Sequence, residues 1–246
     1  MRILILILGL FSSLSALAGI SISKAIVHFE AGGQVSEDVE VFNQGDETLY
    51  IRIEPSIIKN PGSEQAQRVS YRNPKDAGLL VTPQRMVIAP GARKRVRFVR
   101  LDDAAEAKED RVFRVLIKPE VGKVSSRETA VKVIIAYEVL VLSQPGKIKP
   151  DLQHKIDNGK LYLYNAGNTN ILIQNVYQCP PGQSFRDEQH QCKELSGKRL
   201  YADTRWESEL PLKTNVTIHY SIGLDNRELV IDFPRQDQTN KKTAKN

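Results

Sequence analysis

Residues able to do chemistry are spread thinly along this chain of 246 residues. Its four histidines, His28, His154, His190 and His219, are scattered, and none belongs to the H-E-x-x-H pattern of a zinc protease. The chain also has no G-x-S-x-G nucleophile elbow, no phosphate-binding glycine loop and no G-x-G-x-x-G after a strand. We therefore expect a protein that is not an enzyme and that carries no cofactor and no metal.

Residues 1–18, MRILILILGLFSSLSALA, have the organisation of a cleaved secretory signal peptide. Arg2 supplies a positive charge, an apolar run extends from Ile3 to Phe11, and Ala16-Leu17-Ala18 places small residues at the positions that a signal peptidase recognises. The run is shorter than the roughly 20 residues of a membrane-spanning helix, and no later segment is long enough. We expect an exported protein with no membrane insertion.

The two cysteines, Cys179 and Cys192, are expected to form a disulfide, because thiols that reach an oxidising compartment tend to pair. Closing a loop of this size would contribute about 3 kcal/mol in the chain-entropy description. A metal site formed by these cysteines with His190 is the alternative, but it lacks a convincing fourth ligand.

The charge balance is basic, with 35 Lys and Arg against 29 Asp and Glu and a formal net charge of +6. Loss of Arg2 with the signal peptide lowers this charge by one, to +5. The densest basic stretch, Arg93-Lys94-Arg95 with Arg97, suggests a secreted protein that binds nucleic acid or an acidic polysaccharide. On a strand, however, the three arginines share one face, which is typical of any exposed basic strand. Without an aromatic partner patch we expect no nucleic-acid partner.

Alternating apolar and polar residues predict an all-β protein. The segments EDVEVFN, LYIRIEP, RKRVRFVR and RVFRVLIKP have apolar side chains at every second position. Turn-forming groups of Asn, Pro and Gly separate these segments, and no stretch has the 3.6-residue apolar period of a core helix.

The best domain boundary follows the longest β-rich run, where Ser143-Gln144-Pro145-Gly146 breaks the pattern. We expect a first domain over 19–144, a second over 145–234 and a polar tail over 235–246. Two all-β units of these sizes fit two immunoglobulin-like β-sandwich domains.

The run 129–142, TAVKVIIAYEVLVL, is too long for an ordinary strand. It would extend over more than about 40 Å, whereas strands usually have about five or six residues. Its odd-numbered positions from Val131 to Val141 are all apolar. One half can complete the first domain, and the other is then an apolar edge, which natural proteins avoid unless another chain uses it.

The order and spacing of several segments resemble the periplasmic chaperones of bacterial pilus assembly, over essentially the whole chain after the signal peptide. These segments are ISISKAIVHFEAG, EDVEVFNQGDETLYIRI, LLVTPQRMVIAPGARKRVRFV, RVFRVLIKPE and TAVKVIIAYEVLVLSQP. In the second domain, LYLYNAGNTNILIQNVYQC resembles the alternate branch that serves alpha-type fimbriae of the colonisation-factor kind. The resemblance implies two immunoglobulin-like β-sandwich domains in a boomerang arrangement, with a cleft between them.

The resemblance also implies that the chaperone lends the last strand of its first domain to a fimbrial subunit that lacks its own final strand. Counting back from Pro145, the inserted side chains are expected to be Val131, Val133 and Ile135, and Tyr137 completes the subunit-binding strand.

In this family, basic residues in the cleft hold the C-terminal carboxylate of the subunit. This chain departs from the best-known branch, because Ile26 stands where an arginine is expected and Leu140 where a lysine is expected. The candidate substitutes for this carboxylate anchor are Arg114, Lys24 and Tyr137.

The implied partners are major and minor fimbrial subunits and the outer-membrane usher, and the implied location is the periplasm. Because an exposed apolar strand favours aggregation, we also expect the free chaperone to pair with itself as a self-capping homo-oligomer. The alternative is a structural fimbrial subunit or adhesin, since those proteins are also exported and immunoglobulin-like. Such a subunit would usually have one truncated domain and an N-terminal donor segment, whereas this chain has two complete-looking domains.

Overall fold

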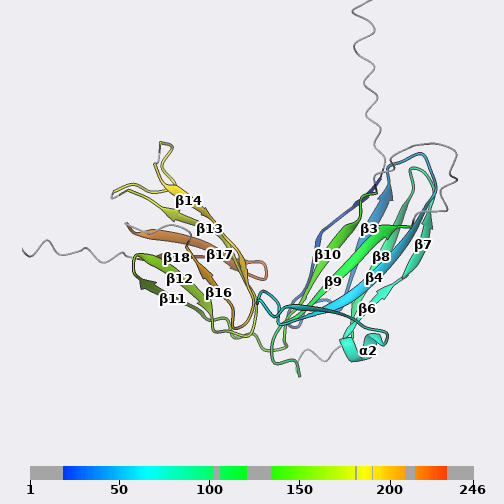
Figure 1. The fold of residues 1–246 in the computed structure, drawn as a ribbon, viewed down its shortest axis with the longest axis horizontal. Coiled ribbons are helices and arrows are strands. Elements are labelled where there is room, and N and C mark those ends of the chain that lie inside the picture. Colours follow the sequence, from blue (N-terminus) through cyan, green and yellow to red (C-terminus); the bar gives the residue numbers. More distant parts are fainter. Residues whose placement is uncertain are drawn as a thin grey trace, which may run out of the picture. The chain divides into compact units, whose positions relative to one another are not determined.

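The computed structural model describes residues 19–101, 106–120, 134–180, 182–189, 191–208 and 214–231. These residues are almost entirely strands and turns (Figure 1), and they divide into two compact units. The division after Ser143 lies one residue before the boundary expected from the sequence. The first unit contains 19–59 and 67–101 with 111–120 and 134–143, while the short segments 60–66 and 106–110 group with the second unit. The expected signal peptide and polar tail lie outside the described residues.

The first domain is a sandwich of two sheets. One sheet has the order β1-β3-β8-β6, and the other has the order β2-β10-β9-β4-β5, with β7 also paired to β4. The bounds are β1 Ile20–Ile22, β2 Ile26–Phe29, β3 Ser36–Asn43, β4 Leu49–Lys59, β5 Gln67–Ser70, β6 Leu79–Thr82, β7 Arg85–Ile88, β8 Arg93–Arg100, β9 Arg111–Pro119 and β10 Tyr137–Ser143.

The core of the first domain consists of the inward-facing apolar residues of both sheets. Its largest fully buried side chains include Phe29, Phe98 and Phe113. The odd-numbered residues of β10 also face this core, since Val139 and Val141 are fully buried in it and Tyr137 packs against it. The alternation seen in the sequence therefore continues into the structure as an inner and an outer face of each sheet.

The first strand of this domain changes sheets. β1 pairs antiparallel with β3, but after Ser23-Lys24-Ala25 the chain continues as β2, which pairs in parallel with β10. The second sheet consequently gains a short edge strand that covers only part of β10.

The single described helix, α2, is a one-turn element over Pro74–Ala77. The side chain of Asn73 accepts a hydrogen bond from the backbone N–H of Lys75 at the helix start, and Gly78 ends the helix with a φ of 83°.

The second domain is also a two-sheet sandwich. Its sheets have the orders β11-β12-β16 and β14-β13-β17-β18, with β15 paired to β13. The bounds are β11 Leu152–Asp157, β12 Lys160–Asn165, β13 Ile171–Gln178, β14 Lys193–Ser196, β15 Arg199–Leu200, β16 Arg205–Glu207, β17 Val216–Ile222 and β18 Asp225–Ile231. Leu161, Leu163, Ile171 and Trp206 belong to its core.

The predicted disulfide between Cys179 and Cys192 is present. The loop that it closes is held on β13 and β17 by aromatic contacts. The Phe185 ring stacks on Tyr177 with 4.7 Å between centroids and meets His219 edge-on at 4.6 Å. Within the described part of the chain, no helix is long and apolar enough to cross a membrane, and no three His, Cys, Asp or Glu side chains gather as metal ligands would.

Candidate functional site

The strand β10 is only partly flanked by other strands. β9 pairs with it along its whole length, Tyr137–Ser143, whereas β2 pairs with it only from Leu140 onward. On the β2 side, the backbone N–H of Leu140 donates a hydrogen bond of 2.9 Å to the Ala25 carbonyl. Among the described residues, Tyr137–Val139 therefore has a strand neighbour on one side only. Its other edge presents backbone donors and acceptors that another strand can pair with.

Apolar side chains continue this open edge beyond the end of the strand. Ile134 and Ile135 precede β10, are not in strand conformation and are 40% and 46% exposed. Ile135 has the same parity as Tyr137 and Val139, the residues of β10 that face the core, but the core does not bury it. The other two expected inserted residues, Val131 and Val133, lie outside the described residues.

The two positions at which this chain departs from the best-known branch lie next to each other. Leu140 on β10 is directly opposite Ile26 on β2, and on its other side it is opposite Arg114 on β9. Leu140 is 7% exposed and Ile26 is 41% exposed. An apolar pair thus occupies this point of the sheet, and the nearest cation in the row is Arg114.

Arg114 lies on the outer face of its sheet and is part of an ion pair. Its Nη1 is 3.8 Å from Oε2 of Glu138, one strand away on β10. The side chain of Tyr137 lies on the inner face of the sheet, opposite to Arg114, because Tyr137 is next to Glu138 in the chain and packs against the core. Arg114 and Tyr137 therefore do not converge on one group.

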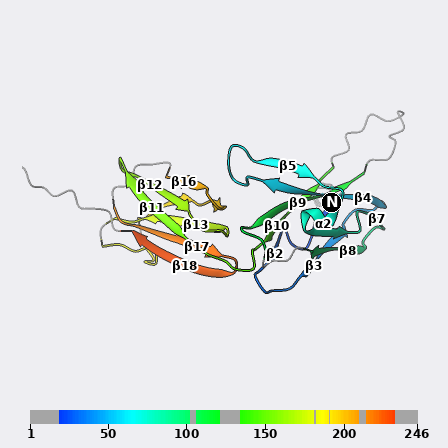
Figure 2. The same ribbon diagram turned by 90° about the horizontal axis from the view of Figure 1, so that it is seen from below.

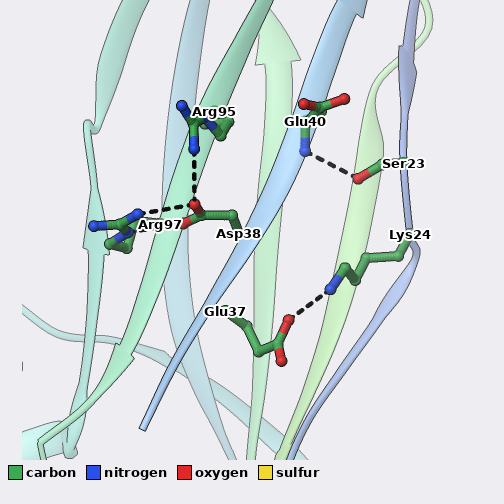
Figure 3. A network of polar contacts seen from close by, with 7 residues as sticks. All are labelled: Ser23, Lys24, Glu37, Asp38, Glu40, Arg95 and Arg97. Atoms are coloured by element: carbon green, nitrogen blue, oxygen red, sulfur yellow. Dashed lines mark hydrogen bonds and ion pairs between the residues drawn. The ribbon is translucent and has the colours of Figure 1, made fainter. Parts of the chain in front are cut away.

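Lys24 is directed to the other sheet. Its Nζ donates to Oε2 of Glu37 on β3 over 2.6 Å, and Figure 3 shows this contact between the segment joining β1 to β2 and the neighbouring strand. The structure thus places the three candidate anchors, Arg114, Lys24 and Tyr137, in three different surroundings. Of the three, Arg114 lies in the row with Leu140 and Ile26.

The basic strand β8 is paired with acidic residues of β3. Arg97 makes two hydrogen bonds to the Asp38 carboxylate, of 2.8 and 2.9 Å, and Arg95 approaches the same carboxylate to 3.6 Å (Figure 3). The hydrogen bond from Arg97, together with the charges of Arg97 and Arg95, holds the pKa of Asp38 below its usual value. These arginines are therefore engaged within their own sheet.

Glu138 has a second partner, Arg68, that the sequence patterns did not indicate. Arg68 on β5 also donates to Glu138, although β9 and β4 lie between their strands in the sheet. Glu138 could have been recognised in the sequence, since it is the one acidic residue in the run 129–142. Arg68 could not, because its contact depends on a partner 70 positions away.

Sequence comparison gives curated relatives among fimbrial proteins of Escherichia coli. A fimbrial subunit of the CS1 system is 26% identical over 185 residues, which cover 73% of this chain and 76% of that protein. A fimbrial subunit of the CFA/I system is 27% identical over 178 residues, 70% of this chain and 73% of that protein. No protein-family model matches the chain.

Solved structures give a more complete match. The class 5 fimbriae chaperone CfaA is 25% identical, and the match covers 88% of this chain and all of CfaA with a TM-score of 0.63. These matches confirm the predicted resemblance to the fimbrial chaperones. A chain in a chaperone–tip adhesin complex of CFA/I fimbriae has a TM-score of 0.61 at 23% identity, over 87% of this chain and 98% of that one. The two-domain, immunoglobulin-like β-sandwich fold is confirmed as well, and the class 5 match agrees with the colonisation-factor branch.

Proposed function

We propose that this protein is a periplasmic chaperone that binds fimbrial subunits by donating the strand that leads into β10, and that it delivers them to an outer-membrane usher. The observation that carries the proposal is the open edge at Tyr137–Val139, next to the exposed Ile134 and Ile135. Pairing of a subunit strand with this edge would satisfy backbone hydrogen bonds along it. The side chains of 131–137 that alternate toward the subunit would fill its open groove.

This role requires binding and no bond-making step, so we propose that the protein is not an enzyme. The binding free energy comes from the burial of apolar side chains, which contributes about 1.5–3 kcal/mol for each fully buried aliphatic residue. Since no described strand covers this edge at Tyr137–Val139, we also propose that two copies cap each other through β10 until one of them receives a subunit.

The test is co-expression with candidate subunit genes from the same locus, followed by purification of the tagged chaperone from the periplasm. A one-to-one complex with a specific subunit is the expected result. Absence of a complex with every subunit of the locus, in a periplasm that contains both proteins, contradicts the proposal. Light scattering of the free chaperone and of the complex tests self-capping, because the subunit should replace the second copy.

The second candidate function is that of a fimbrial subunit, which the names of the two curated relatives favour. The match over the whole length of CfaA favours the chaperone, because it includes both domains. Fractionation distinguishes the two: a chaperone stays in the periplasm, whereas fibres sheared from the cell surface contain the structural subunits.

A further inference from the structure

The short segment 106–110, which leads into β9, is fastened within the second unit by the turn between β12 and β13, residues 166–170. The side-chain amide of Asn168 donates a hydrogen bond of 3.0 Å to the carbonyl of Lys108. The backbone N–H of Asp110 donates over 3.1 Å to the Asn168 carbonyl. β9 begins at the next residue and lies between β10 and β4 in its sheet (Figure 2). The segment is therefore held immediately before a central strand.

The side chain of Asp110 takes part in the same contact. Its Oδ2 accepts two hydrogen bonds from Asn170, one from the backbone N–H over 2.7 Å and one from the side-chain amide. Its Oδ1 is buried and has no hydrogen bond of good geometry to any described residue. One carboxyl oxygen is thus well supplied with donors, and the other is shielded from water without one. An ionised carboxylate in such a position is incompletely stabilised.

One charged residue is linked to this carboxyl through a hydrogen-bond chain. Arg199 on β15 donates to Oδ1 of Asn170, and the amide of Asn170 donates in turn to Asp110. The turn 166–170 itself has no ionisable side chain. Arg111 follows Asp110 in the chain, and the other charged residues nearby line an open pocket beside the turn: Lys108, Glu109, Lys149, Asp151 and Asp203.

These surroundings favour the protonated form of the carboxyl. Burial raises the pKa of Asp110 above its usual value of 3.8, and the hydrogen bonds from Asn170 and Thr169 with the charge of Arg199 offset only part of this effect. A detached segment would expose the carboxyl to water and restore an ordinary pKa. The contribution of the carboxyl to attachment is therefore fully present below the detached pKa and is lost as the pH rises through the attached pKa.

We propose that Asp110 is a proton-sensitive latch, which holds the segment 106–110 on the turn 166–170 more tightly when its carboxyl is protonated than when it is ionised. Attachment is then favoured in mild acid and opposed at neutral pH. Because β9 follows directly and pairs with β10 along the whole length of that strand, the latch sets how firmly the start of β9 is held. The inference goes beyond the proposed function and does not depend on it, since it concerns the protein without a subunit.

Two NMR measurements on the purified protein test this inference. Carbon NMR follows the titration of the Asp110 carboxyl, whose midpoint we expect above 3.8. Hydrogen exchange of the Asp110 backbone N–H, corrected for the intrinsic effect of pH, reports on the opening of its bond to Asn168. Between about pH 4 and pH 7.5, the protection of this amide should decrease by about tenfold for each pH unit by which the attached pKa exceeds the detached one.

Three variants separate the latch from a structural role. Asp110→Asn keeps the shape of the side chain but cannot ionise, so it should remove the pH dependence of the amide protection. Asn170→Ala removes one donor to the ionised carboxylate and should move the titration to higher pH, whereas loss of a purely structural contact would lower stability without moving the titration. Arg199→Gln should move the titration in the same direction, and it supplies this reading if Asn170→Ala is not folded.

The matched control is Glu109→Gln, because Glu109 is the exposed neighbour of Asp110 on the same segment. It should change both measurements little. A carboxyl midpoint at or below 3.8 would overturn the inference, as would an amide protection that does not decrease with pH or that decreases equally in Asp110→Asn. The carboxyl titration of the wild type decides alone if Asp110→Asn is not folded. Co-purification of the subunit tests the proposed function separately from all of these outcomes.

Discussion

Asn43 and Asn165 make the same hydrogen bonds in the two domains. Each side-chain amide donates to the carbonyl four residues ahead, over 2.7 Å to Glu47 and 2.8 Å to Thr169. Each also donates over 3.1 Å to a distant strand end, Ile88 or Leu200. Each side-chain oxygen accepts from the glycine two residues ahead over 3.0 Å. Both asparagines are fully buried, so one buried amide fastens a turn to the sandwich in each domain.

Substitution of either asparagine by alanine should destabilise its own domain. Asn165→Ala leaves two carbonyls without their donor, at a cost of about 2–4 kcal/mol in the free energy of unfolding. Trp206 is the sole tryptophan and belongs to the core of the second domain, so its fluorescence during urea unfolding reports on that domain. Asn165→Ala should shift this transition to lower urea, and Asn43→Ala should shift it much less.

The control for this pair is Asn226→Ala, because the side-chain oxygen of Asn226 accepts one exposed hydrogen bond, from Gln174. It should change the free energy of unfolding by less than about 0.5 kcal/mol. A shift of the Trp206 transition by Asn43→Ala as large as that caused by Asn165→Ala would contradict the assignment of one fastening amide to each domain.

Substitutions at the two members of the apolar pair, Leu140 and Ile26, should differ in their effect on stability. Leu140 is buried, so Leu140→Lys removes apolar burial and places a second cation beside Arg114, and we expect a loss of about 2 kcal/mol or more. Ile26 is substantially exposed, so Ile26→Arg should stay within about 0.5 kcal/mol of the wild type. Chemical denaturation of both variants tests this difference, and equal stability of the two contradicts it.

Local sequence patterns predicted the two-sheet domains because alternation and turn chemistry are local properties. Groups of Asn, Pro and Gly predicted turns between the strands, but the sequence could not predict the hydrogen bonds from Asn43 to Ile88 and from Asn165 to Leu200, since those partners are distant. The residues at which strands begin and end were equally difficult to predict. β10 begins at Tyr137 among the described residues, although the apolar pattern continues to earlier positions, because pairing with β9 begins at that residue.

The candidate site was predictable to a similar extent. The run 129–142 pointed to an open strand edge through its length and its apolar face. The sequence could not indicate that Lys24 would pair with Glu37 or that Arg68 would reach Glu138, because both contacts depend on which strands become neighbours. Arg114 could be proposed as a candidate anchor from its place in the sequence. Only the register between β9 and β10 shows that it lies opposite Leu140.

The pair of Arg97 with Asp38 should be visible in acid titration. The Asp38 carboxyl has its pKa lowered from 3.8, chiefly by the hydrogen bonds from Arg97. Because the folded pKa is the lower one, the contribution of this pair to stability is present above the unfolded pKa and is lost as the pH falls through the folded value. Arg97→Gln should raise the pKa of Asp38 toward 3.8, as followed by carbon NMR of the carboxyl group.

The control for the titration is Arg52→Gln, since Arg52 pairs with Glu120 and Glu54 and not with Asp38. This variant should leave the Asp38 titration unchanged. An Asp38 pKa that does not move in Arg97→Gln would mean that the bidentate contact does not persist in solution.

Ile135→Asp should yield a folded chaperone that fails to hold its subunit. The side chain is 46% exposed and precedes β10, so the substitution does not disturb the core, whereas burial of a carboxylate in an apolar groove is strongly unfavourable. Loss of one buried aliphatic contact alone weakens binding by roughly 10- to 100-fold. The matched control is Val87→Asp, because Val87 lies on β7 of the same domain and is 44% exposed. Co-purification of the subunit should survive in Val87→Asp and be lost in Ile135→Asp, and an Ile135→Asp variant that retains the subunit would exclude residue 135 from the donated strand.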